Sequence, residues 1–396
     1  MNEKILIIGF NTRPIAQSAR AAGFTPVCVD YWGDLDLRSL CLDVFSILEQ
    51  KPGFPLKRGR FPHSIYIEGV KSMLERHPDI SFCLIGSGFD DNPDFWREIS
   101  RLIRVYGNSV DTIRKCRDWR NLFNVLDNLG IPHPQTIITR AERVLDAINE
   151  LGFPVVLKPT RGSGGWGKKL IKSEKDLPRN LKGDYLVQKF INGINASCSF
   201  ISTDSKISFL SINEQLIGTK WLNSPGNFTY CGNIVPLVNW RQIHKKIYDY
   251  ISALTSKMNF IGSNGVDFIV KDDSVYFLEV NPRFQGSLEC IEAVFGINIV
   301  KLHVDACKGQ SSFLHQLKPK GYSCRCILYS PCNCKLIDLR KYKQVRDIPP
   351  PDIIVKRGDP ICSFFFTGNS REEVIRKAKN ATRSLSLELE SRGLKG

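Results

Sequence analysis

A glycine-rich stretch after a strand-like run is the part of this sequence best suited to hold phosphate groups. The stretch is VVLKPTRGSGGWGKKLI, residues 155–171, and Lys158 stands near the end of the expected strand. Glycines follow closely at Gly162, Gly164, Gly165 and Gly167. Glycines let backbone N–H groups turn toward a ligand, and a lysine can neutralise its charge. The pattern favours a triphosphate site, although a plain glycine-rich hairpin turn also explains it, and the GxxxxGK[ST] motif is absent.

A second string, residues 265–287, carries oxygen-bearing side chains that suit a hard metal ion. It reads GVDFIVKDDSVYFLEVNPRFQGS and predicts two strands joined by a charged turn. Glu279 and Asn281 share one face by the period of two, and Asp267 on the partner strand can meet them. Mg²⁺ takes one or two carboxylates together with phosphate oxygens, so the trio predicts a Mg²⁺ site, with Mn²⁺ as an alternative ion. A solvated hairpin face is the other interpretation, but Glu279 lies in the apolar run FLEV, where an unpaired charge is costly.

Residues 1–108 alternate strand-like and helix-like runs, which predicts an α/β domain with a doubly wound, Rossmann-like parallel sheet. KILIIGF and SFCLIG are the expected buried strands, and a polar loop follows each. Ligands of such sheets bind beyond the carboxyl ends of the strands, so we expect substrate contacts from Asn11, Arg13, Ser87 and Gly88. The first loop has one glycine and lacks the dinucleotide fingerprint, which argues against NAD binding.

The rest of the chain predicts two further units. Residues 109–312 open with a helix expected from about Thr112 to Leu129, ended by Gly130 and Pro132, and contain both chemistry-bearing strings. Residues 313–396 predict a small α+β domain that ends in the helix REEVIRKAKNATRSLSLELE.

Composition narrows the class of protein. The chain has 396 residues, of which 24% are charged and 42% hydrophobic, as in globular domains. No apolar run approaches the roughly 20 residues of a membrane-spanning helix, so we expect no membrane partner. Thirteen cysteines without an export signal favour reduced thiols and a cytoplasmic protein. The net charge is +15, but the basic residues are not interleaved with aromatic ones, so nucleic acid is not an expected partner.

Two Cys-x-Cys motifs in the last unit leave a second metal site open. They place Cys324, Cys326, Cys332 and Cys334 close together in the sequence, and four thiols can hold zinc or an iron–sulfur cluster. Structural zinc sites favour wider spacing within each pair, so a strand-borne cluster of buried thiols is the preferred interpretation.

The two chemistry-bearing strings together resemble the ATP-grasp superfamily. The matching positions, in the family's order, are Lys158, the loop from Arg161 to Lys168, Asp267, Glu279, Asn281 and Arg283. The ending NPRFQGS and the opening GFNTR are similar to a branch of carboxylate–amine ligases related to biotin carboxylase, found in archaea and C1-metabolising bacteria. The resemblance implies a Rossmann-like pre-ATP-grasp domain at 1–108, an ATP-grasp domain of two α+β subdomains at 109–312 and a small mixed domain at 313–396.

The resemblance also implies an activity and its residues. ATP and Mg²⁺ are the expected cofactors, and small-molecule carboxylate and amine substrates are the expected partners in forming an amide (C–N) bond through an acylphosphate. Lys158 and Arg283 are the implied catalytic residues, and Asp267, Glu279 and Asn281 the implied Mg²⁺ ligands. The implied nucleotide contacts are Lys115, Lys158, Gly162, Ser163, Gly164, Gly165, Gly167, Gln188, Lys189, Phe190, Ile191 and Asn195. The expected substrate contacts are Asn11, Arg13, Ser87, Gly88, Lys220, Gln285, Gly286 and Ser287.

Departures from the family pattern keep alternatives open. Asp118-Trp119 stands where the family often carries Asp-Lys or Asp-Arg, and Gln188 and Asn195 stand where acids are common. Tryptophan cannot neutralise a phosphate, so we expect Lys115 to substitute, with Arg117 on another helix face. A carboxylase-like enzyme and a nucleotide-binding regulatory protein with an inactive site remain alternatives. The branch also suggests cofactor biosynthesis of the methanopterin or methanofuran type, and a homodimer is compatible with the sequence.

Overall fold

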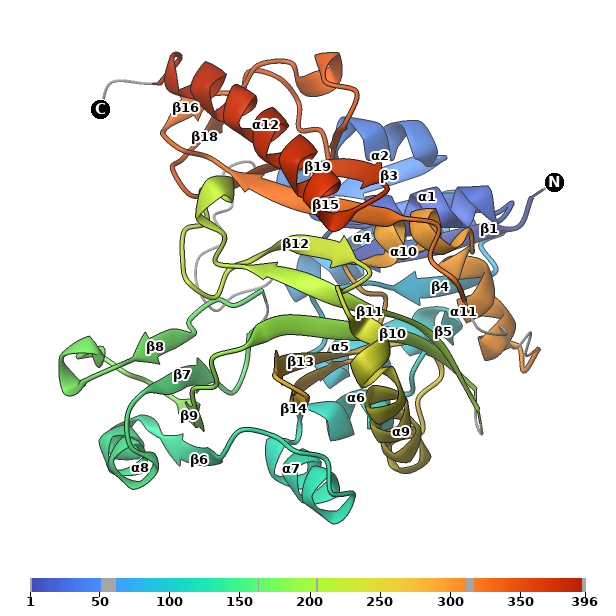
Figure 1. Ribbon diagram of the computed structural model, residues 1–396. Helices are drawn as coiled ribbons and strands as arrows, with labels where there is room; N and C mark the ends of the chain where they lie inside the picture. The colour runs from blue at the N-terminus through green and yellow to red at the C-terminus, as the bar shows by residue number, and fades with distance from the viewer. Residues whose placement is uncertain (1, 51–61, 163, 204–205, 311–316, 394–396) are drawn as a thin grey trace.

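A computed structural model describes residues 2–50, 62–162, 164–203, 206–310 and 317–393. Three regions are visible in Figure 1: an N-terminal parallel sheet, a long antiparallel sheet through the centre and a small sheet beside it. No helix among the described residues is long and apolar enough to cross a membrane.

The N-terminal sheet is parallel and doubly wound, as the sequence predicts. Its strand order is β3-β2-β1-β4-β5, with β1 (Lys4–Gly9), β2 (Thr25–Asp30), β3 (Asp43–Ser46), β4 (Phe82–Ile85) and β5 (Val105–Tyr106). The helices are α1 (Arg13–Ala21), α2 (Leu35–Leu40), α3 (Ile47–Gln50), α4 (His63–Arg76) and α5 (Pro93–Leu102). Ile5 and Ile7 pack toward α1, whereas Leu6 and Ile8 pack toward α4 and α5. Burial on both faces explains the continuous apolar run in β1.

The long sheet contains the predicted metal hairpin at one edge. Its order is β14-β13-β10-β11-β12-β15-β19-β17. The strands are β10 (Ile194–Ser202), β11 (Ile207–Ile217), β12 (Tyr230–Val235), β13 (Gly262–Lys271), β14 (Ser274–Asn281), β15 (Tyr322–Tyr329), β17 (Val345–Arg346) and β19 (Pro360–Gly368). The hairpin prediction is confirmed, because β13 and β14 pair antiparallel with Asp267 opposite Glu279.

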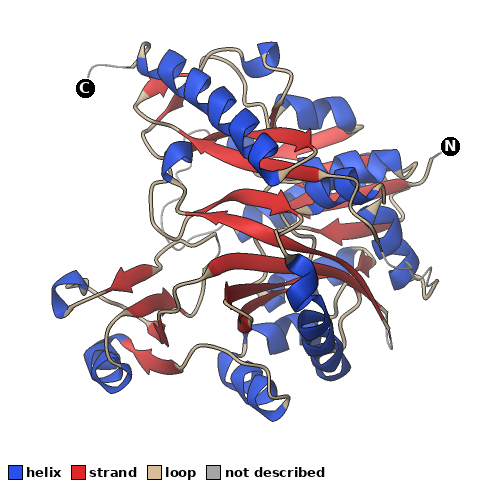
Figure 2. Ribbon diagram, viewed as in Figure 1, coloured by secondary structure: helices blue, strands red, loops and turns tan. Residues whose placement is uncertain are grey.

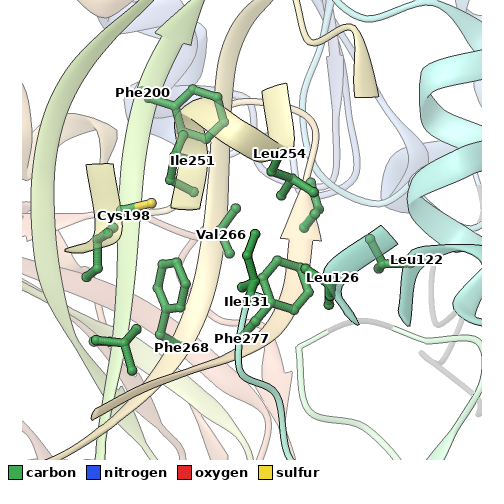
Figure 3. Packing of buried hydrophobic residues seen from close by; sticks show 14 of the residues in the cluster. Leu122, Leu126, Ile131, Cys198, Phe200, Ile251, Leu254, Val266, Phe268 and Phe277 are labelled. Carbon is green, nitrogen blue, oxygen red and sulfur yellow. The ribbon is translucent and has the colours of Figure 1, made fainter. Parts of the chain in front are cut away.

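Helices cover the long sheet (Figure 2). They are α9 (Trp240–Met258), α10 (Leu288–Phe295), α11 (Ile299–Cys307) and α12 (Arg371–Glu390). Apolar side chains of these helices and of the sheet pack together in the core. Figure 3 shows the core beneath the hairpin, where Phe268 and Phe277 meet Leu126, Ile251 and Leu254. The hairpin therefore has an apolar face in the core and a polar face left for chemistry.

The small sheet carries the glycine-rich loop. Its order is β6-β9-β7-β8, with β6 (Thr136–Arg140), β7 (Val155–Pro159), β8 (Lys169–Ile171) and β9 (Asp184–Lys189). Helix α8 (Val144–Leu151) packs on one face and completes a separate apolar cluster. Short elements elsewhere are β16 (Cys334–Lys335), β18 (Ile354–Val355), η1 (Ala141–Arg143), η2 (Glu174–Asp176), η3 (Lys220–Leu222) and η4 (Leu339–Lys341).

The structure corrects the single helix predicted from Thr112 to Leu129. Two helices occupy this region, α6 (Val110–Arg117) and α7 (Trp119–Asn128). Asp118 separates them with a non-helical ψ of 86°, and its side chain accepts a hydrogen bond from Asn121 N. Aspartate is a strong N-cap, so the helix restarts where the apolar periodicity alone predicts continuity.

The long sheet also runs through the expected domain boundary at residue 313. Strand β12, before the boundary, pairs antiparallel with β15, after it. The division at 1–108, 109–312 and 313–396 remains a prediction, and backbone hydrogen bonds join the second and third of these units.

A buried network of ion pairs ties the N-terminal sheet to this long sheet. Arg13, at the start of α1, is 1% exposed and pairs with Glu289 of α10 at 2.6 Å and with Asp347 at 2.8 Å. Arg325 of β15 pairs with Asp347 at 2.5 Å. Burial alone would raise the pKa of Asp347, but Arg325 and Arg13 hold it well below its usual range. The network therefore depends on each charge keeping its partner.

We expect Asp347→Asn to lower the free energy of unfolding by about 3–5 kcal/mol, because two buried guanidinium groups would lose their shared carboxylate. Asparagine tolerates the left-handed backbone at this position, where φ is 55°. The loss of stability would therefore measure the removal of the carboxylate charge and not backbone strain. Urea denaturation followed by circular dichroism measures it.

The matched control is Asp249→Asn, which breaks the exposed Lys245–Asp249 pair and should change stability by about 0.5 kcal/mol or less. A loss for Asp347→Asn as small as the control's would contradict the structural importance of the buried network.

Candidate functional site

The two predicted chemistry-bearing strings meet at one ion pair. Lys158 Nζ, at the end of β7, lies 3.0 Å from Glu279 Oε2 on β14, and Lys168 Nζ lies 3.5 Å from the same oxygen. Burial lowers the pKa of Lys158 to about 8, against the pull of Glu279, which raises it. Burial would raise the pKa of the Glu279 carboxylate, but the nearby cations hold it well below its usual range. The small sheet thus presents positive charge to the polar face of the hairpin.

Trp119 supports Lys158 from the other side. The Lys158 ammonium lies 4.4 Å from the centroid of the Trp119 ring, a distance typical of a cation–π contact. Trp119 Nε1 also donates a hydrogen bond to Thr160 O at 2.9 Å, just after β7. The tryptophan that departs from the family pattern therefore positions the lysine and the start of the glycine-rich loop.

The three predicted Mg²⁺ ligands converge as the hairpin register requires. Asp267 and Glu279 are direct partners across β13 and β14, and Asn281 follows on the face of Glu279. Asp267 Oδ1 accepts a hydrogen bond from Gln215 Nε2 at 3.0 Å. Burial and then the charge of Glu279 raise the pKa of Asp267 to about 7. Two facing carboxylates with this mutual repulsion, next to an amide oxygen, form a donor set that fits Mg²⁺.

This set is small for a metal held by protein alone. No group of three or more His, Cys, Asp or Glu side chains in the described ranges is arranged to hold a metal ion. Mg²⁺ commonly takes its remaining ligands from phosphate oxygens and water. The site therefore suits a metal that arrives with a nucleotide.

Arg283 connects the hairpin to the N-terminal domain. Its Nε donates to Asp90 Oδ2 at 2.8 Å, and its Nη2 donates to Asn281 Oδ1 at 3.2 Å. Asp90 belongs to the loop after β4, where the sequence places substrate contacts. The guanidinium is thus fixed beside the predicted metal ligands, where it can face a carboxylate or phosphate.

Arg117, rather than Lys115, reaches this charged cluster. Lys115 is exposed on α6. Arg117 Nε lies 3.0 Å from Asp91 Oδ1, its Nη1 donates to Val280 O at 2.9 Å, and its charge also lowers the pKa of Glu279. The expectation for Lys115 placed it one turn before residue 119 on a continuous helix, and the helix break at Asp118 removes that relation.

The glycine-rich loop is held between two parts of the protein. Gly162 N donates to Asp91 Oδ2 at 2.5 Å, and Gly164 O accepts from Tyr230 N at 3.3 Å. Gly165 has φ of 84°, and a Cβ there would collide with Phe228 O. Gly167 also has a positive φ, of 78°. Ser163 lies outside the described residues.

The predicted adenine segment follows β9, and its side chains have other partners. Gln188 is buried and donates to Thr136 Oγ1 at 2.9 Å. Lys189 Nζ donates to Leu151 O and Gly152 O at the end of α8. Backbone recognition is still open to Phe190 and Ile191, which are half-buried. Asn195 lies further along, on β10 opposite Ile269.

The residues predicted to contact substrate divide into three groups. Gln285, Gly286 and Ser287 follow the hairpin directly; Gln285 Nε2 donates to Asn281 O, and buried Ser287 accepts from Asn213. Asn11, Ser87 and Gly88 lie in loops after β1 and β4; Asn11 helps to lower the pKa of Asp347, and Ser87 O accepts from Phe10 N. Arg13 forms buried ion pairs with Glu289 and Asp347 and is not available to a substrate. Lys220 is exposed at the start of η3, which contacts α12 and β15.

Sequence reasoning missed polar residues from the long sheet. Tyr230 hydrogen-bonds to Asn233, and the charges of Arg325 and Arg283 both act on its hydroxyl. Asn233 Oδ1 and Arg325 Nε are buried without a hydrogen-bond partner in the described part of the chain. A buried arginine within the strand CRC was the one available signal, because burying an arginine requires a polar surrounding.

The four clustered cysteines are free thiols. Cys324, Cys326 and Cys334 are buried, and Cys332 is half-buried. Burial and mutual contact raise the pKa of Cys324, with the contact to Cys326 the larger cause. A high pKa opposes thiolate formation, which metal binding requires.

Comparisons with known proteins match the part of the chain that contains both chemistry-bearing strings. Residues 116–287 match the family described as ATP-grasp domain. An uncharacterized protein of Methanocaldococcus jannaschii is 24% identical over 371 residues, covering 93% of this chain and 89% of that protein. The carbamoyl phosphate synthase large chain of Clostridium acetobutylicum is 23% identical over 268 residues, covering 65% of this chain and only 24% of that one.

Among solved structures, a similar one is the biotin carboxylase domain of Hydrogenobacter thermophilus 2-oxoglutarate carboxylase, in complex with Mg-ADP, ADP and bicarbonate. The TM-score is 0.72 at 16% identity, over 95% of this chain and 89% of that one. At this identity the likeness establishes the fold.

The surroundings of Lys158 predict its titration. In metal-free protein, isotope-labelled lysine should show one ammonium signal with a pKa of about 8, because burial outweighs the attraction of Glu279. Between about 8 and the ordinary lysine value of about 10.4, the unfolded chain binds more protons, so this group adds stability as pH rises through that window. NMR titration measures the signal.

Lys158→Met should remove the signal, and Glu279→Gln should shift it to lower pH because the attracting charge is lost. An ordinary lysine titration in wild type would contradict the buried placement of Lys158.

Proposed function

The chain contains an ATP-grasp domain within a fold like that of biotin carboxylase, and on this premise we propose that it is an ATP-dependent ligase that joins a carboxylate to an amine. The observation that supports it most is the meeting of Lys158 with Glu279, because it brings the phosphate-binding and metal-binding strings to one place. A role in cofactor biosynthesis of the methanopterin or methanofuran type is part of this proposal.

The proposed reaction has two steps. A substrate carboxylate oxygen attacks the γ-phosphorus of ATP and ADP leaves; an amine nitrogen then attacks the acyl carbon and phosphate leaves. Phosphoryl transfer needs mainly positioning and charge stabilisation, so it requires no side-chain nucleophile. Mg²⁺ held by Asp267, Glu279 and Asn281 would neutralise phosphate charge.

The chain's own residues have distinct roles in this scheme. Lys158 and Lys168 exchange their contact with Glu279 for phosphate oxygens, and the amides of the glycine-rich loop add hydrogen bonds. Arg283, fixed by Asp90, orients the attacking carboxylate. The polar groups of Tyr230, Asn233 and Arg325 provide a buried surface for the second part of the substrate.

A carboxylase-like enzyme is the second candidate. It keeps the activation step but uses bicarbonate as the carboxylate, and the similar solved structure contains bicarbonate. The two candidates differ in the acid that stimulates turnover, so one experiment separates them.

We expect ADP release from Mg-ATP to require one pair from a panel of acids, bicarbonate included, and amines. Glu279→Ala should reduce that turnover by about 100-fold or more, since it removes a metal ligand that acts in the transition state. A coupled assay for ADP, with mass spectrometry of the product, measures both.

Arg376→Gln, on the exposed surface of α12, is the matched control and should retain wild-type turnover. Thermal unfolding verifies that each variant is folded. If wild type binds ATP but no pair releases ADP above the Glu279→Ala rate, the ligase proposal fails and a regulatory nucleotide-binding protein replaces it.

A further inference from the structure

A basic cavity lies next to the proposed nucleotide site. Its volume is about 890 Å³, and it is bounded by the α6–α7 junction, the end of β6 and the residues just after β7. Arginines from all these segments line it: Arg114, Arg117, Arg120, Arg140, Arg143 and Arg161. We refer to this cavity as the arginine groove.

The positive charge of the arginine groove is only partly neutralised. Arg117 pairs with Asp91, Arg114 with Asp111 and Arg143 with Asp146. Arg120, Arg140 and Arg161 are exposed, and in the part of the chain that the structure describes none of them lies within ion-pair distance of a carboxylate.

Three guanidinium groups that have no ion-pair partner among the described residues, from α7, β6 and the loop after β7, therefore line one cavity. Three aspartates also line it: Asp91 pairs with Arg117, Asp118 caps α7, and exposed Asp184 lies opposite Arg140 across β9 and β6, so six arginines meet three carboxylates. Like charges gathered in one concave surface repel one another and raise the local concentration of anions.

Trp119 lies between residues of the arginine groove and Lys158 of the proposed nucleotide site, and it contacts both. The tryptophan lines the groove, and its ring also carries the Lys158 ammonium. Lys158 and the hairpin residues Asp267 and Glu279 are outside the described lining of the groove. The groove therefore adjoins the ATP-grasp site and shares Arg117 and Arg161 with its surroundings, whereas Arg120, Arg140 and Arg143 belong to the groove alone.

We propose that the arginine groove binds a small molecule with two or more phosphate groups. A guanidinium group presents paired N–H donors that match a phosphate, and several arginines on different segments can grip separate phosphates. The volume lies within the range of about 300–1,000 Å³ that is typical of small-molecule sites. Trp119 is the one aromatic side chain among the described lining residues, which disfavours stacking of a polynucleotide's bases.

Inorganic tripolyphosphate, titrated into the full-length protein with EDTA present, tests the proposal by isothermal titration calorimetry. EDTA removes divalent cations, which reduces occupancy of the metal-dependent site. Arg120→Gln/Arg140→Gln should weaken binding about tenfold or more, since each charge-assisted contact is worth roughly one such factor. Arg120→Lys/Arg140→Lys should weaken tripolyphosphate binding less, because lysine keeps the positive charge and loses only the paired N–H donors of the guanidinium group.

Two further variants locate the binding. Arg376→Gln removes an exposed arginine on α12 and should leave the affinity unchanged. Lys158→Gln/Lys168→Gln removes the cations of the proposed nucleotide site and should retain tripolyphosphate binding, so failure of the ligase proposal would leave this test intact.

Several results would overturn the proposal. One is unchanged affinity in Arg120→Gln/Arg140→Gln; another is loss of binding in Lys158→Gln/Lys168→Gln, which would place the anion at the nucleotide site. Equal weakening by Arg376→Gln would indicate diffuse surface attraction. Tighter binding of a single-stranded oligonucleotide through Arg120 and Arg140 would make the ligand a polynucleotide instead.

Discussion

The buried ion pairs around Arg13 are the constraint on which the arrangement of the site depends. A guanidinium group with 1% exposure is stable only if buried carboxylates pair with it. Here these are Glu289 of α10 and Asp347, in the segment before β19. These ion pairs fix the position of the N-terminal sheet relative to the long sheet. Because of that fixed position, the loop after β4 lies where Asp90 can hold Arg283 and Asp91 can hold Arg117.

The small sheet is attached in a different way. Its core, formed with α8, is its own, and Leu186 and Ile138 add apolar contact with the cluster around α7. The contacts around Glu279 and Asp91 are polar instead. Polar contacts of this kind can be exchanged for those of a charged ligand at little net cost, whereas apolar packing cannot. A fixed hairpin and a small sheet with exchangeable polar contacts are the arrangement that the proposed nucleotide site would require.

Local patterns were sufficient for the hairpin and the parallel sheet. The period of two placed Glu279 and Asn281 on one face, and the register then brought Asp267 opposite Glu279. Contacts between distant segments were beyond these patterns. Trp119 meets Lys158, and Arg283 meets Asp90, only because separate elements pack together, and no local period encodes that packing. The helix break at Asp118 had a local signal, the cap, but the stronger apolar periodicity masked it.

Charge balance explains how a tryptophan can occupy a position that is often basic in the family. Glu279 already forms ion pairs with Lys158 and Lys168, and the charge of Arg117 also lowers its pKa. A further cation at residue 119 would add repulsion to a lysine whose pKa burial has already lowered to about 8. The indole instead presents the negative face of its ring to the ammonium and fixes Thr160 through its N–H. Trp119 thus stabilises the same lysine without adding charge, and the exposed arginines of the neighbourhood line the adjoining arginine groove, which Trp119 also lines.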